Sequence, residues 1–308
     1  MSTVNILLST YNGEKHLNEQ LETILQQTSQ NFKLVIRDDG STDETRKIID
    51  QYCRDFPKKI EFIKDDFGNV GISKSFSLLM ENSNADYYFF ADQDDIWMKN
   101  KIQEMMNITK SWDPKKPHMC FSDLIIKNDK TSRQSSYLAT YDLHNTPLNK
   151  IIFKGIIHGC AMLINHQCKL FTLELNEDSR LLHDTSIIYT SYLFGSIEII
   201  KTPLIIHKIH KSNAIGHGTK QPYMVLLKTL AKFLFKNKSY RENILGAYFD
   251  YVKKIETRLD TNTRLEKGFY TQSEIDRLPY IQRKIWFLKY FTPYQGRKID
   301  ILVKLFLI

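Results

Sequence analysis

The sequence has few of the residues that mark disulfide-bonded, fibrous or membrane-spanning chains. Its 308 residues include only 4 cysteines, and none forms a C-x-x-C pair, so a zinc ribbon or a thioredoxin-like motif has no support. Only 12 glycines and 8 prolines are present, which excludes a collagen-like or low-complexity architecture. No apolar run approaches the roughly 18 residues that a membrane-spanning helix needs. We therefore expect core cysteines in a protein of the reducing cytoplasm.

Three common catalytic signatures are also missing. The chain has no G-x-G-x-x-G, no P-loop and no G-x-S-x-G, so dehydrogenase, kinase and hydrolase functions lack support. What is present is a globular composition, with 42% hydrophobic and 25% charged residues. This length suggests one large domain or two modest ones.

The positive charge lies in the C-terminal part of the chain. The formal net charge is +8, but residues 223–308 hold 17 Lys and Arg against 8 Asp and Glu, a net of +9. Residues 1–222 have a net charge of −1. From residue 223 the pattern also changes to helices rich in Lys, Leu, Phe and Tyr. We therefore predict a catalytic domain over 1–222 and a basic, aromatic-rich helical region over 223–308.

Three functions could account for the basic region: binding of nucleic acid, contact with an anionic membrane, or a solvated helical face. Nucleic-acid binding is disfavoured because the first half is acidic and would repel phosphates. In 283–291 and 297–308, basic residues alternate with Trp, Phe, Tyr and Leu, which is typical of helices at a membrane interface. The alternative is that these apolar residues pack against the catalytic domain or a second subunit, as in a homodimer.

Short apolar runs alternate with amphipathic helical patterns along the first hundred residues. This alternation predicts an α/β fold, a Rossmann-like, mostly parallel sheet with helices on both faces. The predicted strands are 4–8, 32–37, 60–64, 86–91, 118–127, 156–164 and 197–206. The predicted helices are 14–27, 43–56, 72–81, 99–110 and 186–194.

Polar clusters follow three of these strands, at the sheet edge where open α/β sheets bind ligands. The third cluster contains Asp92, Asp94 and Asp95, three carboxylates within four residues. Such crowding is tolerated when a cation lies among the oxygens, and carboxylates suit Mg²⁺ or Mn²⁺. For an isolated D-x-D the alternative is a solvated acidic loop in which Asp95 caps a helix.

The other clusters contain residue types that bind a nucleotide. Tyr11, after the first strand, offers a ring on which a base could stack, and Asp39, after the second, could accept a hydrogen bond from a base imide. Alternatively, Tyr11 packs in the core and Asp39 caps the next helix. A fourth cluster, His183-Asp184, opens a predicted helix, where Asp184 could also be a cap.

The order STYNGEKHL, RDDGSTDET, ADQDDIW resembles glycosyltransferase family two, the inverting nucleotide-sugar transferases of GT-A fold. The resemblance is best over 4–110 and recognisable to about 216. ADQDDIW and the His-Asp pair are similar to bacterial rhamnosyltransferase-like members that build surface polysaccharides. The C-terminal helices would then be an extension of the GT-A domain.

The resemblance implies a role for each matching residue. Asp184 would be the catalytic base, although the family more often has Glu-Asp where this chain has His183-Asp184. His210 in the late His-x-x-Asn-x-x-Gly segment would contact the diphosphate or the metal, or be structural. The implied nucleotide-binding residues are Ser9, Tyr11, Asp39, Asn69, Gly71 and Asp92, and the implied metal ligands are Asp92, Asp94 and His210.

The resemblance also implies an activity. The chain would be a metal-dependent inverting transferase that moves a sugar from a UDP- or dTDP-sugar, such as dTDP-L-rhamnose, to a hydroxyl of a saccharide acceptor. A lipid-linked acceptor would place the enzyme at the inner face of the cell membrane. The alternatives are a basic nucleic-acid-binding protein and a non-catalytic interaction module on the same fold.

Overall fold

The computed structural model describes residues 2–128, 134–140, 157–178, 181–209, 238–279 and 282. The chain divides into two compact units. The first comprises Met1–Thr146 and Ile157–Ile209, and the second comprises Pro147–Ile156 and His210–Ile308. The boundary predicted at residue 222 lies outside the described residues and stays a prediction.

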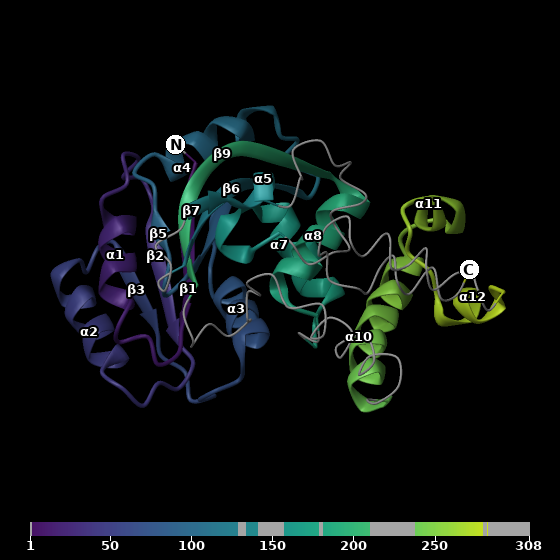
Figure 1. Cartoon of the computed structure of the whole chain (residues 1–308), viewed down its shortest axis with the longest axis horizontal. Helices are drawn as coiled ribbons and strands as arrows, with labels where there is room; N and C mark the ends of the chain where they lie inside the picture. Colours follow the sequence, from purple (N-terminus) through teal and green to yellow (C-terminus); the bar gives the residue numbers. More distant parts are fainter. Residues whose placement is uncertain are drawn as a thin grey trace. The chain divides into compact units, whose positions relative to one another are not determined.

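The described part of the first unit is built on one sheet in the order β3-β2-β1-β4-β8-β6-β9-β5, with β7 paired to β6 (Figure 1). The strands are β1 (Val4–Thr10), β2 (Lys33–Asp38), β3 (Ile60–Ile63), β4 (Tyr87–Asp92), β5 (Ile96–Trp97), β6 (His118–Asn128), β7 (Gln134–Ser136), β8 (Met162–Asn165) and β9 (Ser196–Ile209). Strands β3, β2, β1 and β4 are parallel, as are β6 and β9. Strand β8 runs antiparallel to both of its neighbours.

Helices cover both faces of this sheet. They are α1 (Leu17–Leu25), α2 (Thr45–Asp55), α3 (Ile72–Glu81), α4 (Lys101–Ile108), α5 (Tyr137–Thr140), α7 (His166–Leu175) and α8 (His183–Phe194), with the 3₁₀ turns η1 (Thr109–Ser111) and η3 (Gly159–Ala161). Figure 1 shows α1 and α2 on one side, and α3, α7 and α8 on the other. The predicted α/β fold with helices on both faces of the sheet is thereby confirmed.

The local sequence explains the central elements. Strand β1 is almost wholly buried, as expected of a parallel strand covered by helices on both faces. Helix α1 buries Leu17, Leu21 and Ile24, which share one face at helical spacing. Three of the four free cysteines, Cys120, Cys160 and Cys168, are buried in the core, whereas Cys53 is half-buried.

The middle of the chain differs from the prediction. The strand predicted at 156–164 is in part a 3₁₀ turn, and only Met162–Asn165 forms strand β8. A Cβ on Gly159 would lie 2.5 Å from His183 Nε2, so the chain passes this ring too closely for an ordinary side chain. Helix α7 was not predicted; it begins where the Asn165 side chain accepts a hydrogen bond from the Cys168 N–H.

The described part of the second unit is helical, which confirms the C-terminal helical extension. It contains α10 (Lys238–Glu256), α11 (Thr261–Glu266) and α12 (Gln272–Arg277). The buried Arg264 guanidinium donates to both Glu274 oxygens, at 2.8 and 2.7 Å, and Thr271 and Glu274 form a capping box at the start of α12. Within the described residues no helix is both long and apolar enough to span a bilayer. The stretches 283–291 and 297–308 lie outside the described residues.

Candidate active site

The strand register brings three of the predicted clusters to one sheet edge. Ser9 on β1 pairs with Arg37 on β2 and with Asp92 on β4, so these residues form one row across three parallel strands. Thr10 pairs with Asp38 in the next row. The residues that follow, including Tyr11 and the Asp39 and Asp94 loops, therefore emerge side by side at the carboxyl ends of the strands.

Arg37 is the centre of a buried polar network on the β2 side of this edge. Its guanidinium, which has no exposed surface, donates from Nε and Nη2 to the two oxygens of Asp65, at 2.7 and 3.1 Å. It also donates to Asp39 at 2.6 Å, to Ser75 Oγ at 3.0 Å and to the Gly68 carbonyl at 3.1 Å. All five N–H groups of the guanidinium are thus used.

Charge complementarity holds this network together. Burial lowers the pKa of Arg37, but the hydrogen bonds to Asp65 and Asp39 outweigh it, so the pKa is raised overall. The hydrogen bonds from Arg37 are the main reason that the pKa of Asp65 lies below its ordinary value. A buried guanidinium needs such partners, because an unpaired charge in the core is strongly destabilising.

The Asp39 carboxylate joins the turn after β2 to the loop before α3. Its oxygens accept hydrogen bonds from the N–H groups of Val70 and Gly71, each at 2.9 Å. Gly40 has a φ of +82°, and a Cβ there would lie 3.0 Å from the Asn69 nitrogen. The structure therefore brings the predicted residues Asp39, Asn69 and Gly71 together. Asp39 does not cap α2, so that alternative is wrong.

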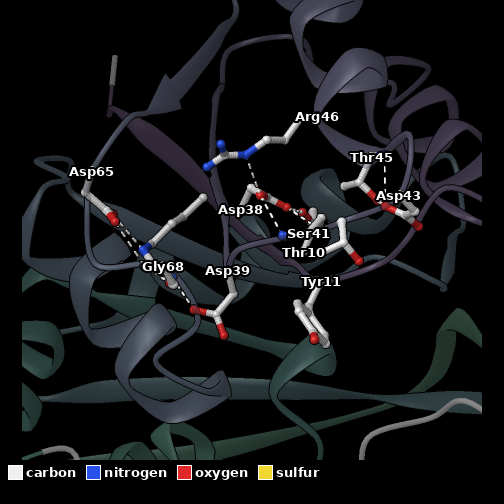
Figure 2. A network of polar contacts seen from close by, with 12 residues as sticks. Thr10, Tyr11, Asp38, Asp39, Ser41, Asp43, Thr45, Arg46, Asp65 and Gly68 are labelled. Atoms are coloured by element: carbon white, nitrogen blue, oxygen red, sulfur yellow. Dashed lines mark hydrogen bonds and ion pairs between the residues drawn. The ribbon is translucent and has the colours of Figure 1, made fainter.

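Tyr11 and Ser9 complete this side of the site. The Tyr11 main chain exchanges two hydrogen bonds with the Gln93 side chain, at 2.8 and 3.0 Å, which ties the end of β1 to the loop after β4. The Tyr11 side chain is 47% exposed, so the core alternative is wrong. Figure 2 shows the Tyr11 and Asp39 side chains pointing the same way, while Arg46 and Asp38 lie on the other side. Ser9 Oγ shares a 2.7 Å hydrogen bond with Ser75 Oγ.

The acidic cluster lies at the end of β4, where Asp94 and Asp95 are buried and Asp92 is partly exposed. Burial, together with the charges of Asp95 and Asp94, raises the pKa of Asp92, and Asp184 adds to the effect. Within the described residues, Asp95 Oδ2 is buried without a hydrogen-bond partner. Crowded carboxylates with an unused oxygen fit a hard divalent cation.

Asp95 forms a buried ion pair that the sequence analysis missed. Its Oδ1 lies 2.7 Å from His207 Nδ1 on β9, and the ligand atoms of Asp95, His207 and Cys160 lie within 4.8 Å of one another. Asp95 therefore does not cap α4. Burial raises the pKa of the Cys160 thiol well above its ordinary value, and a thiol is a softer ligand than the oxygen ligands that suit Mg²⁺ or Mn²⁺. Asp92 and Asp94 are the better candidates.

A buried lysine lies beside the same cluster. Lys101 Nζ donates to the Cys160 carbonyl at 2.6 Å and lies 3.5 Å from the centre of the Trp97 ring. Burial lowers the pKa of Lys101 to about 7, against the opposing effects of Asp95 and Asp92. Two basic groups therefore lie beside the cluster: His207, and Lys101, which loses its proton more readily than an ordinary lysine.

Asp184 lies in the first turn of α8. Burial raises its pKa to about 6, although the Thr185 N–H, 2.6 Å away, acts in the opposite direction. The residue preceding the helix is Leu182, so Asp184 is not the N-cap. The neighbouring His183 ring stacks on Phe76 with 4.0 Å between centroids, and burial lowers its pKa to about 3, which keeps it neutral. His210 lies outside the described residues.

These residues occur in a recognised family. The family model for glycosyl transferase family 2 matches residues 5–161, about half of the chain, and includes all three strand-end clusters. The chain belongs to glycosyl transferase family 2. The resemblance drawn from the three sequence motifs is confirmed.

The chain is similar to proteins with different names and activities. The dTDP-rhamnosyl transferase RfbG of Shigella flexneri is 27% identical over 253 residues, covering 77% of this chain and 82% of that protein. An uncharacterized glycosyltransferase of Nostoc is 29% identical over 216 residues, and the match spans 66% of its length. The teichoic acid poly(glycerol phosphate) polymerase of Staphylococcus epidermidis is 37% identical over 95 residues, 31% of this chain and 13% of that protein.

Solved structures show the fold. S. aureus TarS 1–349 in complex with UDP-GlcNAc matches with a TM-score of 0.52 and 14% identity, over 98% of this chain and 84% of that chain. The same protein in complex with UDP matches with a TM-score of 0.51. At this identity the likeness supports the fold alone.

The Asp95–His207 pair can be tested by its contribution to stability. We expect Asp95→Asn and His207→Gln each to lower the free energy of unfolding by about 3 kcal/mol, because each leaves a buried partner uncompensated. The double variant should lose at least ~1 kcal/mol less than the sum. Urea unfolding of all four proteins measures this coupling.

The exposed Glu44–Lys47 pair on α2 is the matched control, for which a coupling of about 0.5 kcal/mol or less is expected. Equal, additive losses at Asp95 and His207 would show that the two side chains contribute independently.

Proposed function

We propose that this chain transfers a sugar from a UDP- or dTDP-sugar, with dTDP-L-rhamnose as the first candidate, to a hydroxyl of a saccharide acceptor. The carrying observation is the row Arg37–Ser9–Asp92, which gathers a polar network, an exposed aromatic ring and an acidic cluster at one edge. A nucleotide sugar presents a flat base, which suits the aromatic ring and the polar network, and a diphosphate, which needs a cation such as the acidic cluster could hold. Its anomeric carbon is the atom at which the sugar is transferred.

The β2 side of the edge fits the nucleoside. The exposed Tyr11 ring would stack on the base, and Asp39 would accept a hydrogen bond from its imide N–H. Ser9 would line the same pocket, with the Asn69–Gly71 turn beside it. Asp92, at the end of the next strand, would lie near the ribose.

The β4 side fits a divalent cation. Asp92 and Asp94 would hold Mg²⁺ or Mn²⁺, because the crowded carboxylates and the raised pKa of Asp92 indicate a deficit of positive charge. Such a cation would neutralise charge on the departing nucleoside diphosphate. His210, predicted as a further contact, lies outside the described residues.

Asp184 is the proposed catalytic base. It would take the proton from the acceptor hydroxyl as that oxygen attacks the anomeric carbon, and direct displacement would invert this centre. A carboxylate with a pKa of about 6 is largely ionised at neutral pH and still a stronger base than an ordinary aspartate.

Relatives support the substrate class. RfbG is a dTDP-rhamnosyl transferase, and its match with this chain covers most of both proteins. The teichoic acid polymerase match also suggests a role in surface-polymer synthesis. The nucleic-acid alternative gains nothing from the site, because the acidic cluster would repel phosphates. A non-catalytic module gains nothing either, because the residues for each step are present.

Metal dependence is the first test. We expect Asp94→Asn to slow release of UDP or dTDP from a nucleotide sugar by about 100-fold or more, because one oxygen ligand of the cation is lost. EDTA should abolish release by the wild-type protein, and Mn²⁺ or Mg²⁺ should restore it. Asp55→Asn, at the exposed end of α2, is the matched control and should retain full activity. Unchanged rates in EDTA would contradict the proposal.

The pH profile tests the base. Because Asp184 acts only when deprotonated, kcat should fall tenfold per pH unit as the pH drops below about 6, and level off above it. Nucleotide release measured between pH 4.5 and 8 gives the profile. Asp184→Asn should remove both the activity and this limb. A flat profile with a folded protein would assign the proton transfer to another group.

The basic C-terminal region is proposed to bind an anionic membrane, which would bring the enzyme to a lipid-linked acceptor. We expect co-sedimentation with vesicles that contain an anionic lipid, and little with neutral vesicles. Neutralising Arg297, Lys298 and Lys304 to Gln should weaken binding about 100-fold, at about 1 kcal/mol per charge. Equal binding to both vesicle types would contradict membrane docking, and a dimer mass by light scattering would instead favour the subunit alternative.

A further inference from the structure

We propose that Asp95, Cys160 and His207 form a zinc site. It is separate from the magnesium or manganese site proposed at Asp92 and Asp94. The three side chains come from distant parts of the first unit and meet in its core, where all three are buried. The inference goes beyond the proposed function, because zinc binding can be measured without a sugar donor or an acceptor.

The sheet fixes the positions of the three ligands. Ile96 of β5 pairs antiparallel with Ile206 of β9, so Asp95, directly before β5, stands opposite His207. The 3₁₀ turn η3 brings Cys160 to the same point. The ligand atoms of the three residues lie within 4.8 Å of one another. Neighbouring ligand atoms in a tetrahedral zinc site lie roughly 3.5 Å apart, so shifts of about 1 Å would complete the coordination.

The ligand types select zinc over the ions proposed for the neighbouring carboxylates. A cysteine sulfur, a histidine nitrogen and an aspartate oxygen are the three kinds of ligand that proteins offer to Zn²⁺. Mg²⁺ prefers oxygen ligands alone, and Mn²⁺ binds nitrogen and sulfur more weakly than Zn²⁺ does. Two nearby sites of different chemistry would therefore take different ions.

Asp95 can supply a further ligand atom. The residue is only 1% exposed, and its Oδ1 lies 2.7 Å from His207 Nδ1. Within the described part of the chain, Asp95 Oδ2 has no hydrogen-bond partner, and a buried polar atom in that state costs free energy. A carboxylate bound through both oxygens would fill two coordination positions of the zinc ion, and Cys160 and His207 would fill the other two.

Zinc binding would leave the net charge of the buried cluster unchanged. Burial lowers the pKa of His207, but the charge of Asp95 outweighs it and raises the pKa overall, so the two form an ion pair. Cys160 is a neutral thiol, so the three residues sum to zero. Zn²⁺ would displace one proton from His207 and one from Cys160 into solvent. A thiolate, a carboxylate, a neutral imidazole and a dication again sum to zero, which avoids burying a net charge.

The test is zinc affinity, measured on the full chain by competition with a coloured zinc chelator after EDTA treatment and in excess Mg²⁺. The wild-type protein should bind one zinc ion per chain, and Cys160→Ser should bind it about 100-fold more weakly or less tightly still, because the sulfur ligand is lost. Cys168→Ser is the matched control. Its sulfur is equally buried but lies 3.1 Å from Ser191 Oγ, so this variant should bind zinc like the wild-type protein.

Asp94→Asn separates the two sites. It removes a ligand of the proposed magnesium or manganese site and should leave zinc affinity unchanged. Zinc binding that is lost in Asp94→Asn but kept in Cys160→Ser would place the ion among the strand-end carboxylates and overturn the inference. A wild-type protein that binds no zinc would overturn it too, and would leave the proposed transfer reaction untouched.

Cobalt provides a second readout that needs no variant. Co²⁺ commonly takes the place of Zn²⁺, and a cobalt–thiolate bond gives a strong charge-transfer absorption band in the near ultraviolet. The wild-type protein loaded with Co²⁺ should show this band together with the visible bands of tetrahedral Co²⁺. A cobalt spectrum without the sulfur band would overturn the inference even if Cys160→Ser fails to fold.

Discussion

The β2 side of the site, where the nucleotide is proposed to bind, depends on the hydrogen bonds of the buried Arg37 guanidinium. This guanidinium joins β2 to the loop before α3 through Asp65 and Gly68, and to α3 itself through Ser75. A charge can be buried at low cost only when every donor has a partner, and here all five donors have one. The shape of the loop around Asp39 follows from that requirement.

The β4 side of the same edge is crowded with carboxylates. Asp92, Asp94 and Asp95 are opposed by His207, which pairs directly with Asp95, and by Lys101, whose positive charge burial weakens. The Arg37 network satisfies its own hydrogen bonds, whereas the acidic cluster keeps a buried carboxylate oxygen without a partner in the described residues. The two halves therefore differ: the first has its hydrogen bonds complete, and the second has crowded carboxylates that fit the proposed cation.

Sequence periodicity predicted the elements of the first hundred residues because those strands and helices are regular and are joined by short loops. Helix α3, for example, occupies the range predicted for it, 72–81. It also predicted the strand-end clusters, since parallel strands place their carboxyl ends together. Cys160 and His207 could not be found in this way, because only the sheet brings them to Asp95. Arg37 did carry a signal: a charged residue inside an apolar strand must have buried partners, although the sequence does not say which.

Helix α3 connects the two chemical roles. Ser75 forms hydrogen bonds with both Ser9 and Arg37, which places it beside the residues proposed to bind the nucleotide. The next residue, Phe76, stacks on His183, the neighbour of Asp184. Phe90 of β4 lies against the same imidazole, with 5.6 Å between the ring centres. The lack of a side chain at Gly159 makes room for the His183 ring. A neutral, tightly packed histidine thus ties the start of α8 to the helix and the strand that carry the donor site. The position of the proposed base is therefore set by the same core that positions the proposed nucleotide-binding residues, although the two are far apart in the sequence.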